Sequence, residues 1–130
     1  MSNTQNEKKS VQKGNFVNHV GFEVLEKKNN ILLKLDTKSW HLNSNKFLHG
    51  GVTATMLDTA LGISIKNVTG KNCITINLNI SYLKPVIIND IVVSSSEVIQ
   101  TGNNIATAES NIWLDGDIIA KAIGTFKLIG

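Results

Sequence analysis

The 130-residue sequence contains no arginine, so its 13 basic residues are all lysine, and it has one cysteine and one proline. Without a guanidinium group it has no bidentate clamp for a phosphate, and anions must be bound by lysine, hydroxyl or backbone N–H groups. The single Cys73 excludes an internal disulfide and suits a reducing compartment. Because its neighbours are apolar, we interpret Cys73 as a packing residue rather than a nucleophile.

Long apolar runs and a clustered basic stripe are also missing. No run approaches the roughly 20 apolar residues that cross a bilayer, and the polar segment 1–14 does not resemble a signal peptide. The net charge of +3 is mild and is interpreted as solvated surface, with weak attraction for a nucleotide phosphate as the alternative. No histidine or cysteine set has metal-ligand spacing. We therefore expect a cytoplasmic protein with no metal, cofactor, nucleic-acid or membrane partner.

The chain length fits one domain. We predict that residues 1–14 form a disordered lead-in and that residues 15–130 fold as a single unit. In the first part of this unit, a helical turn at 16–19 is followed by two short strands, at 22–27 and 31–36. Asn29 and Asn30 are suited to the turn between these strands.

The segment 39–48 is irregular, and the pattern then changes to a helix over 51–66 that is apolar around almost its whole circumference. Such a helix belongs inside a fold. Strands are predicted at 74–82, 91–99, 105–114 and 118–128, with a hairpin turn at Asp115-Gly116. In the first of these strands, alternation places Ile74, Ile76, Leu78, Ile80 and Tyr82 on the core face. The order favours an α+β fold, with a curved antiparallel sheet wrapped around one long helix.

Asp58 lies near the middle of the apolar helix. An unpaired carboxylate in such surroundings costs several kcal/mol, so it needs a hydrogen-bond partner or a raised pKa. Carboxylates held in this way are frequent at active sites. The alternative is an aspartate on a solvated stripe beside Thr55 and Gly62, and the periodicity favours neither interpretation.

The tripeptide His49-Gly50-Gly51 stands where the irregular segment enters the helix. Glycines let a ligand approach the backbone closely, and the free N–H groups of a helix N-terminus attract negative charge. These groups suit an oxyanion hole for acyl transfer. Asp58 lies about 10 Å or more farther along the helix by its rise, so a second protomer could supply the missing half of such a site.

The stretch from Asn43 to Ala60 resembles the PaaI-type, or 4-hydroxybenzoyl-CoA thioesterase-like, group of hotdog thioesterases. It has an Asn, then His-Gly-Gly six residues later, then the helical Asp of Leu57-Asp58-Thr59-Ala60. The run Thr75 to Pro85, a glycine turn at Gly102 and the closing segment Ala120 to Phe126 are also similar. The resemblance covers residues 20–130 and implies the hotdog fold and hydrolysis of an acyl-CoA or aryl-CoA thioester, with coenzyme A as part of the substrate.

The resemblance also implies roles for individual residues. Asp58 would act as general base or nucleophile, the Gly50 amide would polarise the carbonyl, and Asn43 would bind the carbonyl or the water. His49 would orient the Asn43 loop or assist product departure, and Thr75 would place the water. Gly51, Lys46 and Thr59 would contact substrate. In this group Asp58 of one subunit faces the glycine turn of another, so we expect a homodimer, with two dimers forming a homotetramer.

Some alternatives stay open at this point. His49 could simply cap the helix, and Thr75 could belong to the polar face of a strand. Lys46 departs from the group, which commonly has glycine there, so a bulkier loop could narrow the pocket or bring an ammonium near the substrate. The competing functions are a non-catalytic acyl-CoA or lipid-binding hotdog protein and a hotdog hydratase or dehydratase. The latter is disfavoured because no histidine follows Asp58 on its helix.

Overall fold

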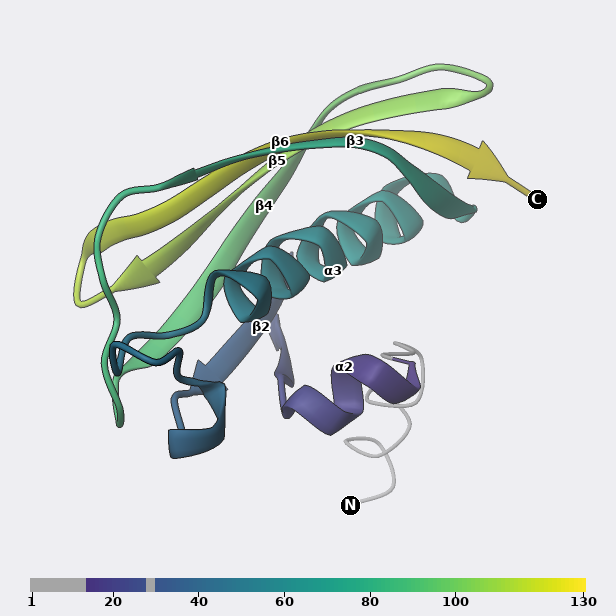
Figure 1. Cartoon of the computed structure of the whole chain (residues 1–130). Helices are drawn as coiled ribbons and strands as arrows, with labels where there is room; N and C mark the ends of the chain where they lie inside the picture. The colour runs from purple at the N-terminus through teal and green to yellow at the C-terminus, as the bar shows by residue number, and fades with distance from the viewer. Residues whose placement is uncertain (1–13, 28–29) are drawn as a thin grey trace.

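A computed structural model describes residues 14–27 and 30–130, and it shows a six-stranded antiparallel sheet curved over one long helix (Figure 1). The elements run α2 (Asn15–Val20), β1 (Glu23–Lys27), β2 (Asn30–Asp36), the 3-10 helix η1 (Ser39–His41), α3 (Gly50–Thr69), β3 (Asn72–Tyr82), β4 (Ile91–Thr101), β5 (Ile105–Leu114) and β6 (Asp117–Ile129). The predicted lead-in lies outside the described residues except for Gly14, as does Asn29 of the predicted turn. The predicted fold class is confirmed.

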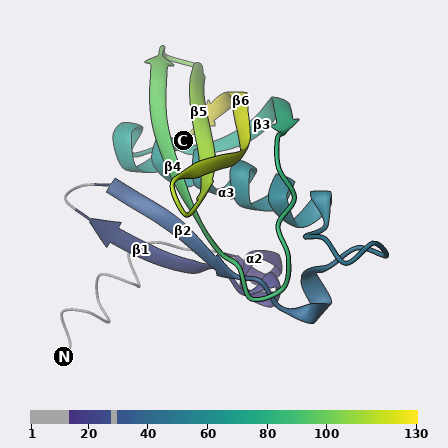
Figure 2. The same ribbon diagram turned by 90° about the vertical axis from the view of Figure 1, so that its left-hand side faces the viewer.

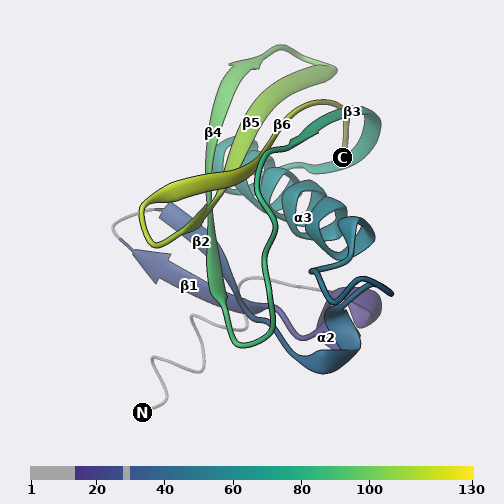
Figure 3. The same ribbon diagram turned by 60° about the vertical axis from the view of Figure 1, so that its left-hand side comes forward.

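The sheet has the strand order β1-β2-β4-β5-β6-β3. Figures 2 and 3 show the β1–β2 hairpin at one edge and β3 at the opposite edge, with α3 crossing the concave face between them. Asp115 and Gly116 both have positive φ, 50° and 87°, as the predicted two-residue hairpin turn between β5 and β6 requires. The 11-residue strand β3 lies at the end of the strand order, so that among the described strands it is bonded to β6 alone and leaves one edge free.

Helix α3 packs on the sheet through one face, which carries Thr53, Met56, Leu57, Ala60, Leu61 and Ile65. The strands β5 and β6 oppose it with small side chains, among them Ala106, Ala108, Ala120 and Ala122. At Gly124 a Cβ atom would lie 3.2 Å from Leu61 Cδ1 and 2.7 Å from Phe126 Cε1. The small side chains of the alanines and the lack of a side chain at Gly124 let α3 come close to the sheet. The helix continues three residues beyond the predicted end and stops at Gly70, whose φ of 74° is left-handed.

Strand β3 departs from the predicted alternation because it contains a β-bulge. Thr75 pairs with Phe126 and Asn77 pairs with Thr125, so Ile76 between them has no partner. The extra residue shifts the facing by one: Thr75 is on the helix side before the bulge, and Leu78 and Ile80 are on that side after it. The prediction is wrong for Ile74 and Ile76, which are 55% and 56% exposed.

Candidate functional site

The carboxylate of Asp58 lies half-buried on the side of α3 that faces β3. Thr75 Oγ1 donates a hydrogen bond of 2.7 Å to Asp58 Oδ1, so the partner expected for this carboxylate is present. Within the described part of the chain no group donates to the second oxygen, Oδ2. A carboxylate with one oxygen held and the other free can accept a proton from a water molecule.

Cys73 faces α3 from the same side of β3, two residues before Thr75. Its Sγ lies 3.9 Å from the position that a Cβ atom on Gly62 would take. Burial, and to a lesser extent the nearby Asp58 carboxylate, raises the pKa of the Cys73 thiol. Because the thiolate is the nucleophilic form, these surroundings lower the reactivity of the sulfur, in agreement with a packing role.

The N-terminus of α3 is capped by the ring of His49, whose Nδ1 accepts a 2.8 Å hydrogen bond from the Gly51 N–H. The N–H groups of Val52 and Thr53 both bond to the His49 carbonyl, at 2.9 and 3.2 Å. Gly51 therefore has no free N–H for a substrate. In the first turn, the Gly50 N–H is left without an acceptor among the described residues. The capping alternative for His49 is the one that the structure supports.

Tyr82, at the end of β3, holds this turn in place. Its hydroxyl donates to the Gly50 carbonyl at 3.0 Å, and its ring would lie 3.5 Å from a Cβ atom at Gly50. Alternation predicted a core position for Tyr82, which is wrong because this residue is 56% exposed. The hydrogen bond joins residues that are 32 apart in sequence, so no local pattern predicts it.

A pocket of about 370 Å³ opens beside the Gly50 turn. Asn43, Gly50, Thr53, Tyr82 and Lys84 supply its polar lining, and aliphatic side chains that include Leu48 and Val86 complete it. Lys84 forms an exposed ion pair with Asp117, with Nζ 3.2 Å from Oδ2. Since an exposed pair of this kind is weak, the Lys84 ammonium remains available to an anionic ligand at the pocket rim.

Asn43 closes the loop before α3 on itself. Its Oδ1 accepts from the N–H groups of Asn45 and Phe47, at 2.9 and 3.0 Å, which leaves its amide NH2 group as the part that can donate to a ligand. Lys46 has a left-handed backbone with φ of 68°. That conformation favours glycine, which accounts for the glycine common at this position in the group that the sequence resembles. The Lys46 side chain is exposed at the loop.

His41 supports the same loop from below and was not singled out by its sequence. It is 3% exposed; its Nδ1 accepts from the Lys38 N–H at 2.9 Å and its Nε2 lies 2.7 Å from the Val20 carbonyl. The His41 carbonyl in turn accepts the His49 N–H at 2.8 Å. His41 of η1 therefore contacts α2 through its ring and the start of α3 through its backbone carbonyl.

The predicted residues thus fall into two groups on one chain. Asp58 and Thr75 form the first, with the half-buried Thr59 adjacent, and Gly50 and Asn43 form the second around the pocket. Eight residues separate Gly50 from Asp58, a rise of about 12 Å along the helix. Asp58 does not line the pocket. On one chain the two groups, called half-sites below, therefore lie apart along α3.

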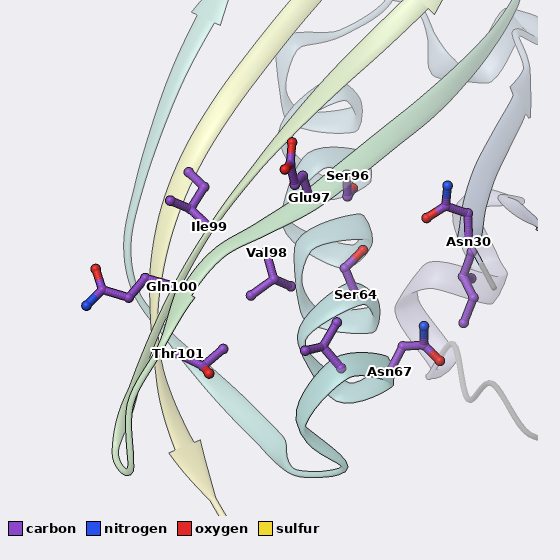
Figure 4. Close-up of a pocket in the computed structure, with 11 residues that line it drawn as sticks. Asn30, Ser64, Asn67, Ser96, Glu97, Val98, Ile99, Gln100 and Thr101 are labelled. Atoms are coloured by element: carbon purple, nitrogen blue, oxygen red, sulfur yellow. The ribbon is translucent and has the colours of Figure 1, made fainter.

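A second pocket, of about 420 Å³, lies between the C-terminal half of α3 and the strands β2 and β4 (Figure 4). Ser64 and Asn67 of α3 and Ser96 and Gln100 of β4 contribute to its lining, together with the carboxylate of Glu97. Its described lining includes no lysine. A phosphate-bearing ligand is therefore better matched by the pocket at Gly50.

Two further properties bear on the chemistry. Among residues 14–27 and 30–130, no three His, Cys, Asp or Glu side chains gather closely enough to hold a metal ion. In the same part of the chain, no helix combines the length and apolarity that crossing a membrane takes.

Residues 45–121 match the family model of the thioesterase superfamily. An uncharacterized acyl-CoA thioester hydrolase of Buchnera aphidicola subsp. Schizaphis graminum is 32% identical over 97 residues, which cover 74% of this chain and 71% of that protein. The E. coli PaaI protein from the phenylacetic acid degradation operon superposes with a TM-score of 0.86 at 18% identity, covering 97% of this chain and 92% of that chain. Streptococcus mutans smu.793, solved bound to acetyl CoA, superposes at 0.79 with 22% identity, over 85% and 90%.

Proposed function

Because the chain belongs to the thioesterase superfamily and has the PaaI-like hotdog fold, we propose that it hydrolyses an acyl-CoA or aryl-CoA thioester to the free acid and coenzyme A. The observation that carries the proposal is the carboxylate of the half-buried Asp58, with Oδ1 held by Thr75 and Oδ2 without a donor among the described residues. The named activity of the Buchnera relative and the acetyl CoA in the Streptococcus mutans structure support it.

In the proposed reaction, Asp58 removes a proton from water as the water oxygen attacks the thioester carbonyl carbon. The Gly50 N–H donates to the oxygen that becomes negative, and the Asn43 NH2 group supplies a second donor. Collapse of the intermediate breaks the carbon–sulfur bond, and the proton goes to the departing thiolate of coenzyme A. Alternatively, Asp58 itself attacks, and water then hydrolyses the resulting anhydride.

The geometry of the two half-sites supports assembly as a homodimer. Strand β3 offers 11 residues of free edge, and Ile74 and Ile76 on it are exposed. Unpaired edge strands pair readily with a second chain, and two antiparallel β3 strands would continue the sheet across a two-fold axis. Asp58 of one protomer would then approach Gly50 of the other. Exposed side chains on the outer face of the sheet, including Ile105 and Ile123, offer a contact for a second dimer and hence a homotetramer.

The lysines near the pocket suit the substrate that we propose. Coenzyme A carries several phosphates, and in a chain without arginine these must be bound by lysine or backbone groups. Lys84 lines the pocket rim, and Lys46 lies exposed on the neighbouring loop. The half-buried single thiol Cys73 is compatible with a cytoplasmic setting, where it stays reduced.

Gly50→Pro is the sharpest test of the oxyanion donor. Gly50 is the first helical residue, where proline is favoured, and His49 before it has the extended backbone, φ −63° and ψ 134°, that proline tolerates. The variant removes an N–H that has no acceptor within the described chain, so folding should be preserved and thiol release should fall about 100-fold. Gly50→Ala is the matched control: it keeps the N–H, and its Cβ meets the Tyr82 ring at an ordinary 3.5 Å.

A complementation experiment tests the shared site. Asp58→Asn and Gly50→Pro subunits are each expected to be inactive, and a mixed dimer holds one intact site. Because about half of randomly mixed dimers are hybrids with one working site of two, activity should return to about a quarter of the wild-type value. Mixtures that stay inactive while hybrids form would place both groups in one subunit. Thiol release across short, long and aromatic acyl-CoAs identifies the acyl group, and binding without release would indicate a sensor.

A further inference from the structure

The hydroxyl of Thr53 makes no hydrogen bond to the described residues, and its oxygen keeps some exposure although the residue as a whole is buried. Thr53 is 4% exposed and lines the pocket beside Gly50. Two other threonines of α3 behave differently: Thr55 Oγ1 donates to the Gly51 carbonyl at 2.8 Å, and Thr69 Oγ1 donates to the Ile65 carbonyl at 2.7 Å. Thr53 and Thr59 are the threonines of α3 whose hydroxyls make no hydrogen bond to the described residues, and of these two only Thr53 lines the pocket beside Gly50.

The local backbone explains why Thr53 does not bond in the same way. The carbonyl four residues before it belongs to His49, and that oxygen already accepts the N–H groups of Val52 and Thr53 at 2.9 and 3.2 Å. A carbonyl oxygen has two lone pairs, so the usual acceptor for the Thr53 hydroxyl is occupied. The Thr53 hydroxyl is therefore left available to donate to a ligand or a water molecule in the pocket.

The position of Thr53 on α3 directs the hydroxyl toward the Gly50 turn. Residues three apart lie on the same face of a helix, and each Cα–Cβ bond tilts toward the N-terminus. The side chain of Thr53 therefore leans over the turn that begins at Gly50, and both residues line the same pocket. Two donors without acceptors among the described residues, the Gly50 N–H and the Thr53 O–H, open on one space.

We propose that Thr53 is a further catalytic residue, whose hydroxyl donates a hydrogen bond to the substrate carbonyl oxygen beside the Gly50 N–H. This rests on the proposed thioester hydrolysis. As water adds, the carbonyl oxygen becomes an oxyanion with three lone pairs, so the Thr53 hydroxyl can donate beside Gly50 and Asn43 and stabilise the transition state more than the ground state. No proton is transferred from Thr53, and the hydroxyl is unchanged after turnover.

Thr53→Val tests the proposal because valine has nearly the same shape and lacks the hydroxyl. We expect kcat for an acyl-CoA to fall about tenfold or more, with a Tm close to that of the wild type, since the substitution breaks no hydrogen bond to the described residues. Thr53→Ser should keep most of the turnover. Thr55→Val, which removes a hydroxyl already bonded within the helix, is the matched control and should turn over as the wild type does.

A binding measurement keeps this test independent of turnover. The probe is a ketone analogue of acyl-CoA in which a methylene replaces the sulfur, compared by calorimetry with an S-alkyl-CoA that has no carbonyl. Thr53→Val should lower the affinity for the ketone analogue about tenfold and leave the affinity for the S-alkyl-CoA unchanged. Only the ketone has a carbonyl that accepts from the hydroxyl. Equal affinities of wild type and Thr53→Val for the ketone, or equal kcat, would overturn the role of Thr53. A wild type that binds both probes but releases no thiol would instead refute the proposed hydrolysis.

Discussion

Thr75 donates its hydroxyl to the carboxylate of Asp58 at 2.7 Å, joining strand β3 to helix α3 across 17 residues of sequence. The bond depends on the β-bulge at Ile76, which puts Thr75 on the helix side of β3 while Ile74 and Ile76 face away from the helix. A single irregularity in the edge strand therefore orients the one carboxylate of α3.

Asp58→Asn should remove turnover while preserving the fold. The amide keeps an oxygen that accepts from Thr75, but it cannot take a proton from water, and loss of a general base costs about 10²- to 10⁴-fold in kcat. Thiol release measures the rate and thermal unfolding measures the fold. Asp36→Asn is the control, because Asp36 is an exposed partner of Lys38 outside either half-site. Full activity in Asp58→Asn would eliminate the proposed mechanism.

Thr75→Val should lower kcat by about tenfold, which corresponds to ~1.4 kcal/mol for the hydrogen bond that holds the carboxylate. Thr75→Ser keeps the hydroxyl and should retain most of the activity. The KM should change little in either variant if Thr75 acts on Asp58 rather than on the substrate. Steady-state kinetics on both variants distinguishes the two cases, and a Thr75→Val enzyme with unchanged kcat would reduce Thr75 to a strand residue.

Cys73 should react slowly with iodoacetamide near neutral pH. Burial first, and the Asp58 carboxylate second, raise the pKa of its thiol, so less thiolate is present than in an unfolded chain at the same pH. Asp58→Asn removes the second cause and should speed the alkylation, and raising the pH should speed it in both proteins. Mass spectrometry follows the reaction, with the denatured chain as reference. A native rate equal to the denatured rate would contradict the raised pKa.

Lys46→Gly should stabilise the protein, because Lys46 has a left-handed backbone with φ of 68°. Relief of this strain is worth about 0.5–1 kcal/mol after the greater entropy of glycine in the unfolded chain is allowed for. Urea unfolding measures the increase in the free energy of unfolding. Lys46→Ala keeps the backbone strain and should show no such increase, so equal stability of the two variants would refute the explanation. Both lose the ammonium, and an equal rise in KM would report its contact with substrate.

Local patterns determined much of this fold. The proline-free apolar segment after residue 50 predicted α3, and Asp115-Gly116 predicted the hairpin with both residues at positive φ. The spacing of Asn43, His49-Gly50-Gly51 and Asp58 indicated the superfamily, whose model matches residues 45–121. These features could be predicted because helix period, strand period and turn geometry are set by residues that are neighbours in sequence.

The tertiary structure decided the contacts that give those residues their chemistry. The sequence alone determined that Asp58 lies on α3 and that Gly50 lies at its start. Packing decided that Thr75 donates a hydrogen bond to Asp58 and that Tyr82 donates one to Gly50. Packing also decided that the ring of His49 accepts from the Gly51 N–H, while the Gly50 N–H has no acceptor among the described residues. The bulge in β3 and the contact between Tyr82 and Gly50, which are 32 residues apart, depend on how α3 packs on the whole sheet. Such packing involves segments that are distant in sequence, so a short stretch of sequence does not predict it.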